Sequence, residues 1–329
     1  MSLFRSVRSV ADGLLQQQYL CNRQAATTIF LAARLGKPLL VEGPAGAGKT
    51  SLATALAGAL QTRLIRLQCY PGLDEAKALY QWNYQKQLLY IQAVMGKERG
   101  WEELRQDIYT PDFLLARPLL EAFLADEQVV LLVDEVDKSD EELESFFLEA
   151  LSEFQVTIPE LGTVRAKHIP FTLLTSNNTR ELSDALKRRC LYLYLPYPDP
   201  EQERAIIALK APGLNRQLSG QIVEFVQTLR RLPLKKSPSI AETLDWARTL
   251  LVLEAGQLDA DVVAGSLNVL LKHREDVERV REQLDGLLPE VGSKEQATSP
   301  GEIGLPSLSI TADEEEGDQE PVDLSRFNF

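Results

Sequence analysis

The 329-residue sequence is poor in the residues that build metal sites and disulfide frameworks. Its three cysteines, Cys21, Cys69 and Cys190, lie far apart and form no CxxC pair. It has only two histidines, His168 and His273, so we expect no structural zinc site. Unpaired cysteines of this kind suit the reducing interior of the cell best.

Long hydrophobic runs and an excess of positive charge are also missing. No stretch approaches the roughly 18 apolar residues of a membrane-spanning helix, and the N-terminus has no signal-peptide pattern, so we expect a cytoplasmic protein without membrane attachment. The formal net charge is −13, and residues 291–329 alone hold nine acidic and two basic residues. This argues against a broad nucleic-acid-binding surface, although a basic channel formed on assembly stays open.

What the sequence does contain is a phosphate loop at residues 43–50, which matches GxxxxGK[ST] and follows the apolar run 38–41. Its glycines let backbone N–H groups turn towards phosphate oxygens, and the helix after it presents its positive end to an anion. Lys49 can reach the β- and γ-phosphates of ATP, and the Thr50 hydroxyl can bind Mg²⁺. The residues expected to contact the nucleotide are Gly43, Pro44, Ala45, Gly46, Ala47, Gly48, Lys49, Thr50 and Ser51.

A pair of carboxylates follows the next fully apolar run. Residues 129–133 are all apolar, and Asp134 and Glu135 follow them directly. Asp134, at the end of the expected strand, is placed to hold Mg²⁺, and Glu135 is placed to polarise the water that attacks the γ-phosphate. A solvated strand end is the alternative, but the complete phosphate loop upstream favours an ATP-hydrolysing site.

Two further groups flank later strands. Asn177 closes the strand that ends at Thr175, and its amide can hold the attacking water or touch the γ-phosphate; Asn178 could take this part instead. Arg188 and Arg189 precede the last expected strand. A guanidinium matches the charge that develops on the transferred phosphate, so either arginine could act as a finger in a neighbouring copy's site. The alternative is that these cations stabilise the carboxyl end of their own helix.

Alternating apolar strands and helices predict an α/β fold with a doubly wound parallel sheet. We expect strands at 38–42, 64–68, 129–133, 171–175 and 191–195, helices at 24–35, 50–60, 141–154 and 181–187, and a hairpin at 155–158 and 162–166. Residues 74–125 show mixed helical patterns. The expected domains are a nucleotide-binding domain at 1–199, an all-α lid of four or five helices at 200–290, and a disordered acidic tail at 291–329, which is either inert or a docking peptide.

The phosphate loop, Asp134-Glu135, Asn177 and Arg188-Arg189, in this order and followed by a helical lid, resemble those of an AAA+ ATPase, a P-loop NTPase. The resemblance covers roughly residues 20–288. It implies that Asn177 matches sensor 1 and that Arg189 best matches the finger.

Three shorter segments narrow the resemblance. The hairpin at 155–166 resembles the pre-sensor-1 insertion of one AAA+ branch, and residues 67–74 and 122–126 look most like MoxR-type proteins. Within that group the chain resembles versions linked to maturation of molybdenum-type carbon monoxide dehydrogenase. This implies an ATP-driven, Mg²⁺-dependent hexameric ring that acts as a chaperone or remodeller, with a von Willebrand factor A-domain protein or a metalloenzyme client as partner.

The lid departs from the MoxR pattern at one position. The sensor-2 region of that group reads Ser-Pro-Arg, but this chain reads Ser237-Pro238-Ser239. The expected arginine is therefore absent, and Lys235 or Lys236 could replace it only imperfectly, because a lysine is a point charge.

Other functions of a phosphate loop stay open to different degrees. A nucleotide or small-molecule kinase would need an acceptor-binding domain, and a GTPase would need an Asn-Lys-x-Asp motif, which the sequence lacks. A nucleic-acid-dependent AAA+ ATPase of the clamp-loader or McrB-like kind is opposed by the net charge. A nucleotide-gated scaffold with little turnover is disfavoured by Glu135.

Overall fold

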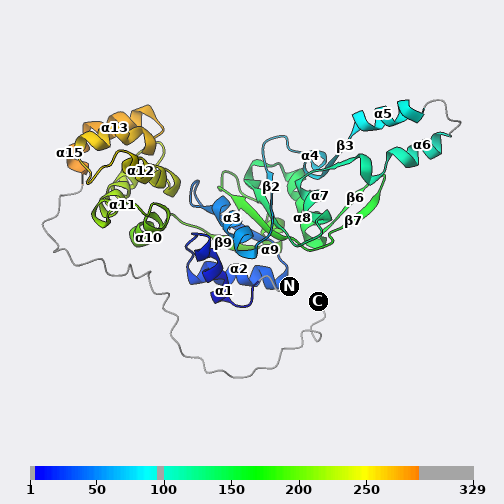
Figure 1. Ribbon diagram of the computed structural model, residues 1–329, viewed down its shortest axis with the longest axis horizontal. Helices are drawn as coiled ribbons and strands as arrows, with labels where there is room; N and C mark the ends of the chain where they lie inside the picture. The colour runs from blue at the N-terminus through cyan, green and yellow to red at the C-terminus, as the bar shows by residue number, and fades with distance from the viewer. Residues whose placement is uncertain (1–3, 95–99, 289–329) are drawn as a thin grey trace, which may run out of the picture. The chain divides into compact units, whose positions relative to one another are not determined.

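The computed structural model describes residues 4–94 and 100–288 (Figure 1). The acidic tail expected at 291–329 lies outside the described residues. Among the described helices, none is long and apolar enough to cross a membrane.

A five-stranded, all-parallel sheet forms the centre of the first part of the chain. The strand order is β2-β5-β8-β1-β9. The strands are β1 (Leu39–Glu42), β2 (Leu64–Gln68), β5 (Val130–Asp134), β8 (Phe171–Ser176) and β9 (Leu191–Tyr194). Every residue of β1, β5 and β8 is buried, which explains their near-continuous apolar sequences. The five predicted strands are confirmed to within one residue at each end.

Helices cover both faces of this sheet. Leu39 and Val41 of β1 pack with one set of helices, and Leu40 packs with the other, because successive side chains of a strand point to opposite faces. The first set is α1 (Val7–Gln16), α2 (Arg23–Leu35) and α3 (Lys49–Leu60). The second set is α4 (Glu75–Leu79), α7 (Pro118–Leu124), α8 (Glu141–Glu153) and α9 (Asp184–Arg189). The predicted doubly wound arrangement is confirmed.

The segment between β2 and β5 differs from the expected mixture of helices. It contains a two-stranded antiparallel sheet of β3 (Tyr80–Trp82) and β4 (Leu114–Ala116), which the sequence reading missed. Strands of three residues are too short to show a period-2 pattern. The helices α5 (Tyr84–Val94) and α6 (Trp101–Ile108) lie between these strands and extend side by side in Figure 1, and a short 3₁₀ helix η1 (Pro111–Phe113) precedes β4.

Two other elements of this part refine the predictions. The hairpin is confirmed, with β6 (Gln155–Ile158) paired antiparallel to β7 (Gly162–Arg165). The helix expected at 181–187 is α9, which runs from Asp184 to Arg189. It begins at Asp184 because the Ser183 side chain caps it by accepting from the Leu186 N–H. Arg188 and Arg189 therefore lie in its last turn. A 3₁₀ helix η2 (Val136–Lys138) follows β5.

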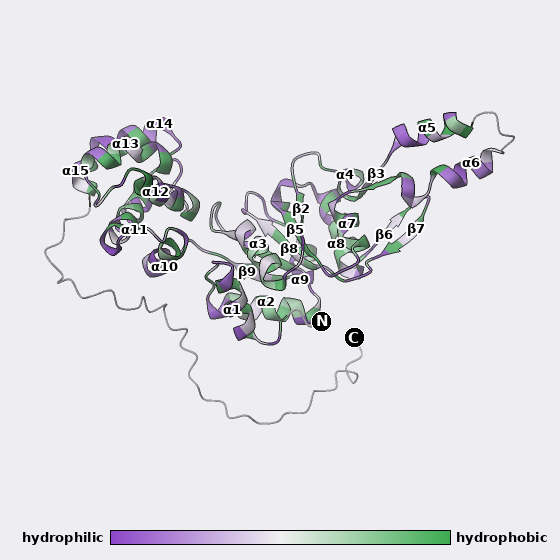
Figure 2. Ribbon diagram, viewed as in Figure 1, coloured by the Kyte–Doolittle hydropathy of each residue, from purple (hydrophilic) through white to green (hydrophobic). Residues whose placement is uncertain are grey.

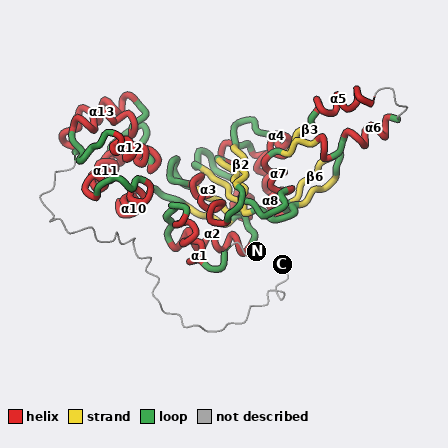
Figure 3. Tube along the Cα trace, in the orientation of Figure 1, coloured by secondary structure: helices red, strands yellow, loops and turns green. Residues whose placement is uncertain are grey.

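In residues 200–288 the regular secondary structure is entirely helical, and loops join the helices (Figure 3). They are α10 (Pro200–Lys210), α11 (Arg216–Arg231), α12 (Ile240–Val252), α13 (Ala260–Leu270), α14 (Arg274–Glu282) and α15 (Leu284–Leu287). Hydrophobic and hydrophilic residues alternate along α11 and α13 (Figure 2), as expected for helices that bury one face. Residues 200–288 thus contain six helices rather than the expected four or five, because no Pro or Gly marks the break between α14 and α15. The domain boundary at residue 199 stays a prediction.

Candidate nucleotide-binding and hydrolysis site

The phosphate loop joins β1 to α3, and two of its glycines sit where a side chain would clash. A Cβ on Gly43 would lie 2.1 Å from the Leu195 carbonyl oxygen. A Cβ on Gly46 would lie 2.2 Å from the Ser239 hydroxyl, and Gly46 also has φ +77°, a conformation that glycine adopts without strain. Both positions therefore require glycine in this structure.

Lys49 is buried at the start of α3 and is held by neutral acceptors. Its Nζ donates to the carbonyl oxygens of Gly43 at 2.7 Å and Pro44 at 2.8 Å. Burial lowers the pKa of Lys49 from its ordinary value, although Asp137 and the carboxylates at 134–135 favour its charged form. Because no carboxylate among the described residues forms an ion pair with this ammonium, it can exchange the two carbonyls for phosphate oxygens.

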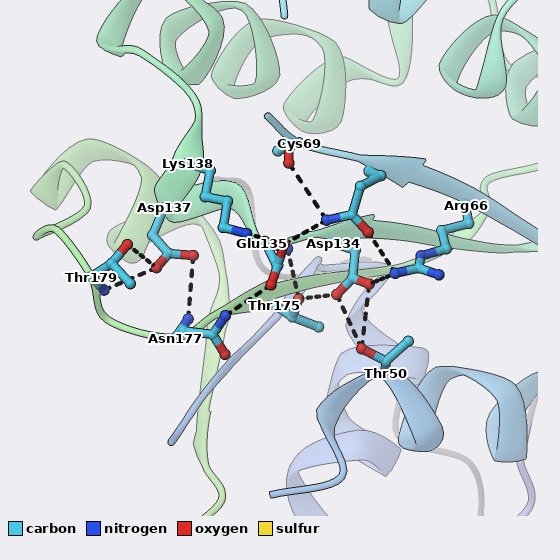
Figure 4. Close-up of polar contacts among 11 residues, drawn as sticks. Thr50, Arg66, Cys69, Asp134, Glu135, Asp137, Lys138, Thr175, Asn177 and Thr179 are labelled. Carbon is cyan, nitrogen blue, oxygen red and sulfur yellow. Dashed lines mark hydrogen bonds and ion pairs between the residues drawn. The ribbon is translucent and has the colours of Figure 1, made fainter. Parts of the chain in front are cut away.

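Asp134, at the end of β5, receives four polar contacts (Figure 4). The Thr50 hydroxyl donates to its two carboxylate oxygens at 3.2 and 3.3 Å, and the Thr175 hydroxyl donates at 2.5 Å. Arg66, on the neighbouring strand β2, forms an ion pair with it. The oxygens of Thr50 and Asp134 converge, and hard oxygen donors of this kind are what Mg²⁺ prefers. The donor set therefore fits the ion that the sequence predicts.

Glu135 has a left-handed backbone, with φ +57°, which is uncommon for a residue with a side chain. Its N–H donates to the Thr175 hydroxyl at 2.9 Å, so this hydroxyl links both carboxylate residues. Its carboxylate accepts from Gln68 and Lys138, each at 2.7 Å. The hydrogen bond and charge of Glu135 raise the pKa of Lys138. Backbone strain fixed by several hydrogen bonds is typical of a functional position.

Asn177 follows the last residue of β8, and its side chain contacts Glu135. Its Nδ2 donates to Glu135 Oε1 at 3.1 Å, whereas Asn178 only donates its N–H to the Ser176 hydroxyl. The loop is fixed by the buried Asp137, which accepts from the Asn177 N–H at 3.2 Å and from the N–H and hydroxyl of Thr179 at 2.9 and 2.6 Å. Of the two asparagines, Asn177 is thus the one directed at the carboxylate.

The two arginines lie away from this cluster. The Leu191 N–H donates to the Pro38 carbonyl, so α9 ends at the amino edge of the sheet, whereas the phosphate loop leaves from the carboxyl edge. A four-residue strand spans about 13 Å. Arg189 donates to the Leu148 carbonyl at 2.5 Å and to the Ser152 hydroxyl at 2.8 Å, both on α8. Among the described residues, the exposed Arg188 has no hydrogen bond or ion pair.

Neither lysine that could replace the missing lid arginine points freely at the phosphate loop. Lys235 forms an ion pair with Glu275 at 2.8 Å, and Lys236 forms one with Glu242 at 2.9 Å. Glu242 also accepts from the hydroxyl of Ser239, the residue that covers Gly46. Lys236 is therefore linked through Glu242 to the serine that covers the loop.

Sequence reasoning missed four residues that hold the site together. They are Arg66, Gln68, Asp137 and Thr175. Arg66 and Gln68 alternate with apolar residues in β2, and this pattern usually marks a solvated strand face. Thr175 was read as part of an apolar strand. The sequence signal that could have identified these residues is their position: each is a polar residue at or near the end of a predicted strand.

Similarity to known proteins agrees with this geometry. Residues 38–190 match the family model of the AAA domain, dynein-related subfamily. This part of the chain is therefore similar to an AAA domain. The chain has the α/β P-loop AAA+ fold that the sequence predicted, with a five-stranded parallel sheet and helices after it.

Individual relatives of this chain are distant. An uncharacterized protein of Staphylococcus haemolyticus is 25% identical over 225 residues, which cover 67% of this chain and 77% of the relative. An uncharacterized protein of Staphylococcus aureus is 25% identical over 242 residues, covering 70% and 83%. The RuvB Holliday junction branch migration motor of Thermotoga maritima has a TM-score of 0.42 and 19% identity, covering 79% of this chain and 69% of that one.

Proposed function

We propose that this chain is an ATP-hydrolysing AAA+ protein of the MoxR type that works as a ring oligomer and remodels other proteins. The observation that carries the proposal is the convergence of Thr50, Asp134 and Glu135 at the edge where the phosphate loop leaves the sheet. A kinase would need an acceptor site beside the phosphates, whereas Glu135 Oε1 faces the amide of Asn177. Such a pair suits an attacking water.

The proposed chemistry is the hydrolysis of ATP to ADP and phosphate. Water forms a new bond to the γ-phosphorus while the bond from that phosphorus to the β,γ-bridging oxygen breaks. Glu135 orients and polarises this water, and Asn177 holds Glu135 in place by its hydrogen bond. Lys49 binds the β- and γ-phosphate oxygens. Mg²⁺, held by Thr50 and Asp134, would neutralise charge on the phosphates.

The proposal of a ring rests on where the arginines lie. Arg188 and Arg189 stand at the amino edge of the sheet, opposite their own phosphate loop. A guanidinium from this position serves a triphosphate only if that triphosphate belongs to another copy. The hexameric state, the von Willebrand factor A-domain partner, the metalloenzyme client and the cytoplasmic location belong to this proposal through the MoxR resemblance.

Glu135→Gln tests the proposal. The variant should bind ATP like the wild type and lose most turnover, because the amide cannot polarise water as the carboxylate does. Equilibrium binding of a fluorescent ATP analogue and phosphate release measure the two effects. Wild-type turnover in the variant would refute the assignment. Strong stimulation of the wild-type ATPase by single-stranded or duplex DNA would replace the chaperone with a nucleic-acid-dependent motor.

A further inference from the structure

The helical part contains a buried ion pair that lies outside the hydrolysis cluster. Arg230 on α11 donates from Nη1 and Nη2 to the two carboxylate oxygens of Glu203 on α10, both at 2.8 Å. Glu203 has no exposed surface and also accepts from Gln227 at 2.8 Å and Thr243 at 3.1 Å. A buried carboxylate is tolerated only when it is paired and hydrogen-bonded in this way. The guanidinium is therefore fixed in one orientation.

This pair holds two segments that lie outside α10 and α11. The Nε of Arg230 donates to the Pro238 carbonyl at 2.9 Å, and its guanidinium carbon lies 5.2 Å from the centre of the Tyr197 ring. Thr243, which donates to Glu203, also donates to the Ser239 carbonyl at 2.9 Å. Both the Tyr197 segment and the turn at 238–239 thus depend on the same ion pair.

Both segments touch the phosphate loop. The Tyr197 hydroxyl donates to the Ala45 carbonyl at 3.2 Å. The Ser239 hydroxyl lies where a side chain on Gly46 would stand. Neither group carries a charge at neutral pH, so neither can neutralise phosphate as an arginine would. What they can do is fix the backbone of residues 45 and 46, whose N–H groups are expected to bind phosphate.

We propose that Arg230, clamped by Glu203, is the positioning residue that couples the helical part to the phosphate loop through Tyr197 and the 238–239 turn. It acts on the nucleotide through other residues and does not touch it. The inference rests on the proposed function, because it assumes that this loop binds ATP. It adds a device made of uncharged contacts at the loop, in a chain that lacks the expected lid arginine.

Two substitutions separate this role from a purely structural one. Tyr197→Phe removes one hydroxyl at the loop and keeps the ring that packs on Arg230. Arg230→Lys keeps the positive charge but loses the two-pronged bond to Glu203 and the Nε donor. Arg274→Lys is the matched control, since Arg274 forms an exposed pair with Glu278 at 2.7 Å on α14.

The measurements are the dissociation constant for a fluorescent ATP analogue with Mg²⁺, the KM and kcat of ATP hydrolysis, and the thermal unfolding midpoint. Tyr197→Phe should raise the dissociation constant and KM about fivefold, the effect of one net hydrogen bond, with kcat and the midpoint unchanged. Arg230→Lys should raise them about tenfold. The double variant should match Arg230→Lys alone, because both changes cut the same path. The control should behave like the wild type.

Several outcomes would overturn the inference. Unchanged analogue binding in Tyr197→Phe would do so even if Arg230→Lys failed to fold. An Arg230→Lys protein with a lowered midpoint and wild-type binding would make the ion pair structural only. Additive effects in the double variant would mean two independent contacts. A wild-type chain that does not bind the analogue would refute the proposed function itself, and the inference with it, whereas the other outcomes leave the proposed function intact.

Discussion

Thr175→Val would test how the two carboxylates of the candidate site are held. The Thr175 hydroxyl donates to the buried Asp134 and accepts from the Glu135 N–H, so a single oxygen supports both residues. Valine keeps the branched shape and the strand preference of threonine but removes this oxygen. Any change in stability or turnover should therefore result from the loss of the hydrogen bonds of Thr175 to Asp134 and Glu135.

The expected loss can be estimated from these two bonds. A hydrogen bond to a charged group contributes roughly 1.5–3 kcal/mol, and a buried N–H without an acceptor costs roughly 1–3 kcal/mol. Arg66 and Thr50 continue to support Asp134, which reduces the first effect. We expect the free energy of unfolding to fall by about 3 kcal/mol. The left-handed backbone of Glu135 should relax, and displacement of a catalytic group by about 1 Å can lower turnover about 100-fold.

Urea unfolding followed by circular dichroism gives the stability, and phosphate release at saturating ATP gives kcat. Thr175→Ser is the control, because it keeps the hydroxyl and should retain most of both quantities. Thr172→Val is a second control on the same buried strand, where the hydroxyl makes only a 3.4 Å contact with the Pro170 carbonyl. If Thr175→Val matches Thr172→Val in stability and turnover, the hydroxyl does not hold the site and the reasoning is wrong.

Three further predictions concern other parts of the site. Lys49→Ala should abolish binding of a fluorescent ATP analogue, because no other described cation contacts the phosphate loop; retained affinity would contradict this. Arg189→Ala should lose ATPase activity and regain part of it when mixed with Lys49→Ala, whose subunits still supply Arg189, and Arg188→Ala tested in the same mixture identifies the finger. No regain with either arginine variant would count against action between copies. Burial alone would raise the pKa of Asp137, but hydrogen bonds from the loop after β8 outweigh it and lower the pKa. Its stabilising effect is therefore present above the unfolded pKa, near 4, and is lost as the pH falls through the lower folded pKa; Asp137→Asn should flatten this acid limb in urea unfolding between pH 2 and about 5.

The fold was predictable from the sequence because each central strand carries its own signal. An apolar run such as 130–133 is buried on both faces whatever its neighbours are, and parallel strands bring their carboxyl ends to one edge. Asp134 and Asn177 could therefore be expected near the phosphate loop from the sequence alone. The roles assigned to them remain predictions.

The supporting residues could not be predicted, because their contacts depend on register between strands. Gln68 pairs with Asp134 in the β2–β5 register, which brings its amide to Glu135. Nothing within the sequence of β2 specifies that offset. Likewise, the helix expected at 181–187 extends to Arg189 and ends at the C-cap Cys190, so both arginines fall inside α9.

The positions of the described cations indicate that one chain supplies too little positive charge at its phosphate loop for the proposed reaction. The residue of the described helical part that faces Gly46 of the phosphate loop is Ser239, whose hydroxyl is bonded to Glu242. Lys236 is already paired with the same glutamate. Lys49 is the one cation bound within the loop among the described residues, and its burial already disfavours charge. Phosphoryl transfer spreads negative charge over several oxygens, which a single buried ammonium meets poorly. Arg66 and Lys138 of the cluster are already paired with Asp134 and Glu135. Arg188 and Arg189 lie at the opposite edge of the sheet. We therefore propose that the missing positive charge comes from a second chain or from the metal ion. The proposed ring, in which each copy faces its neighbour's phosphate loop, would supply the first of these.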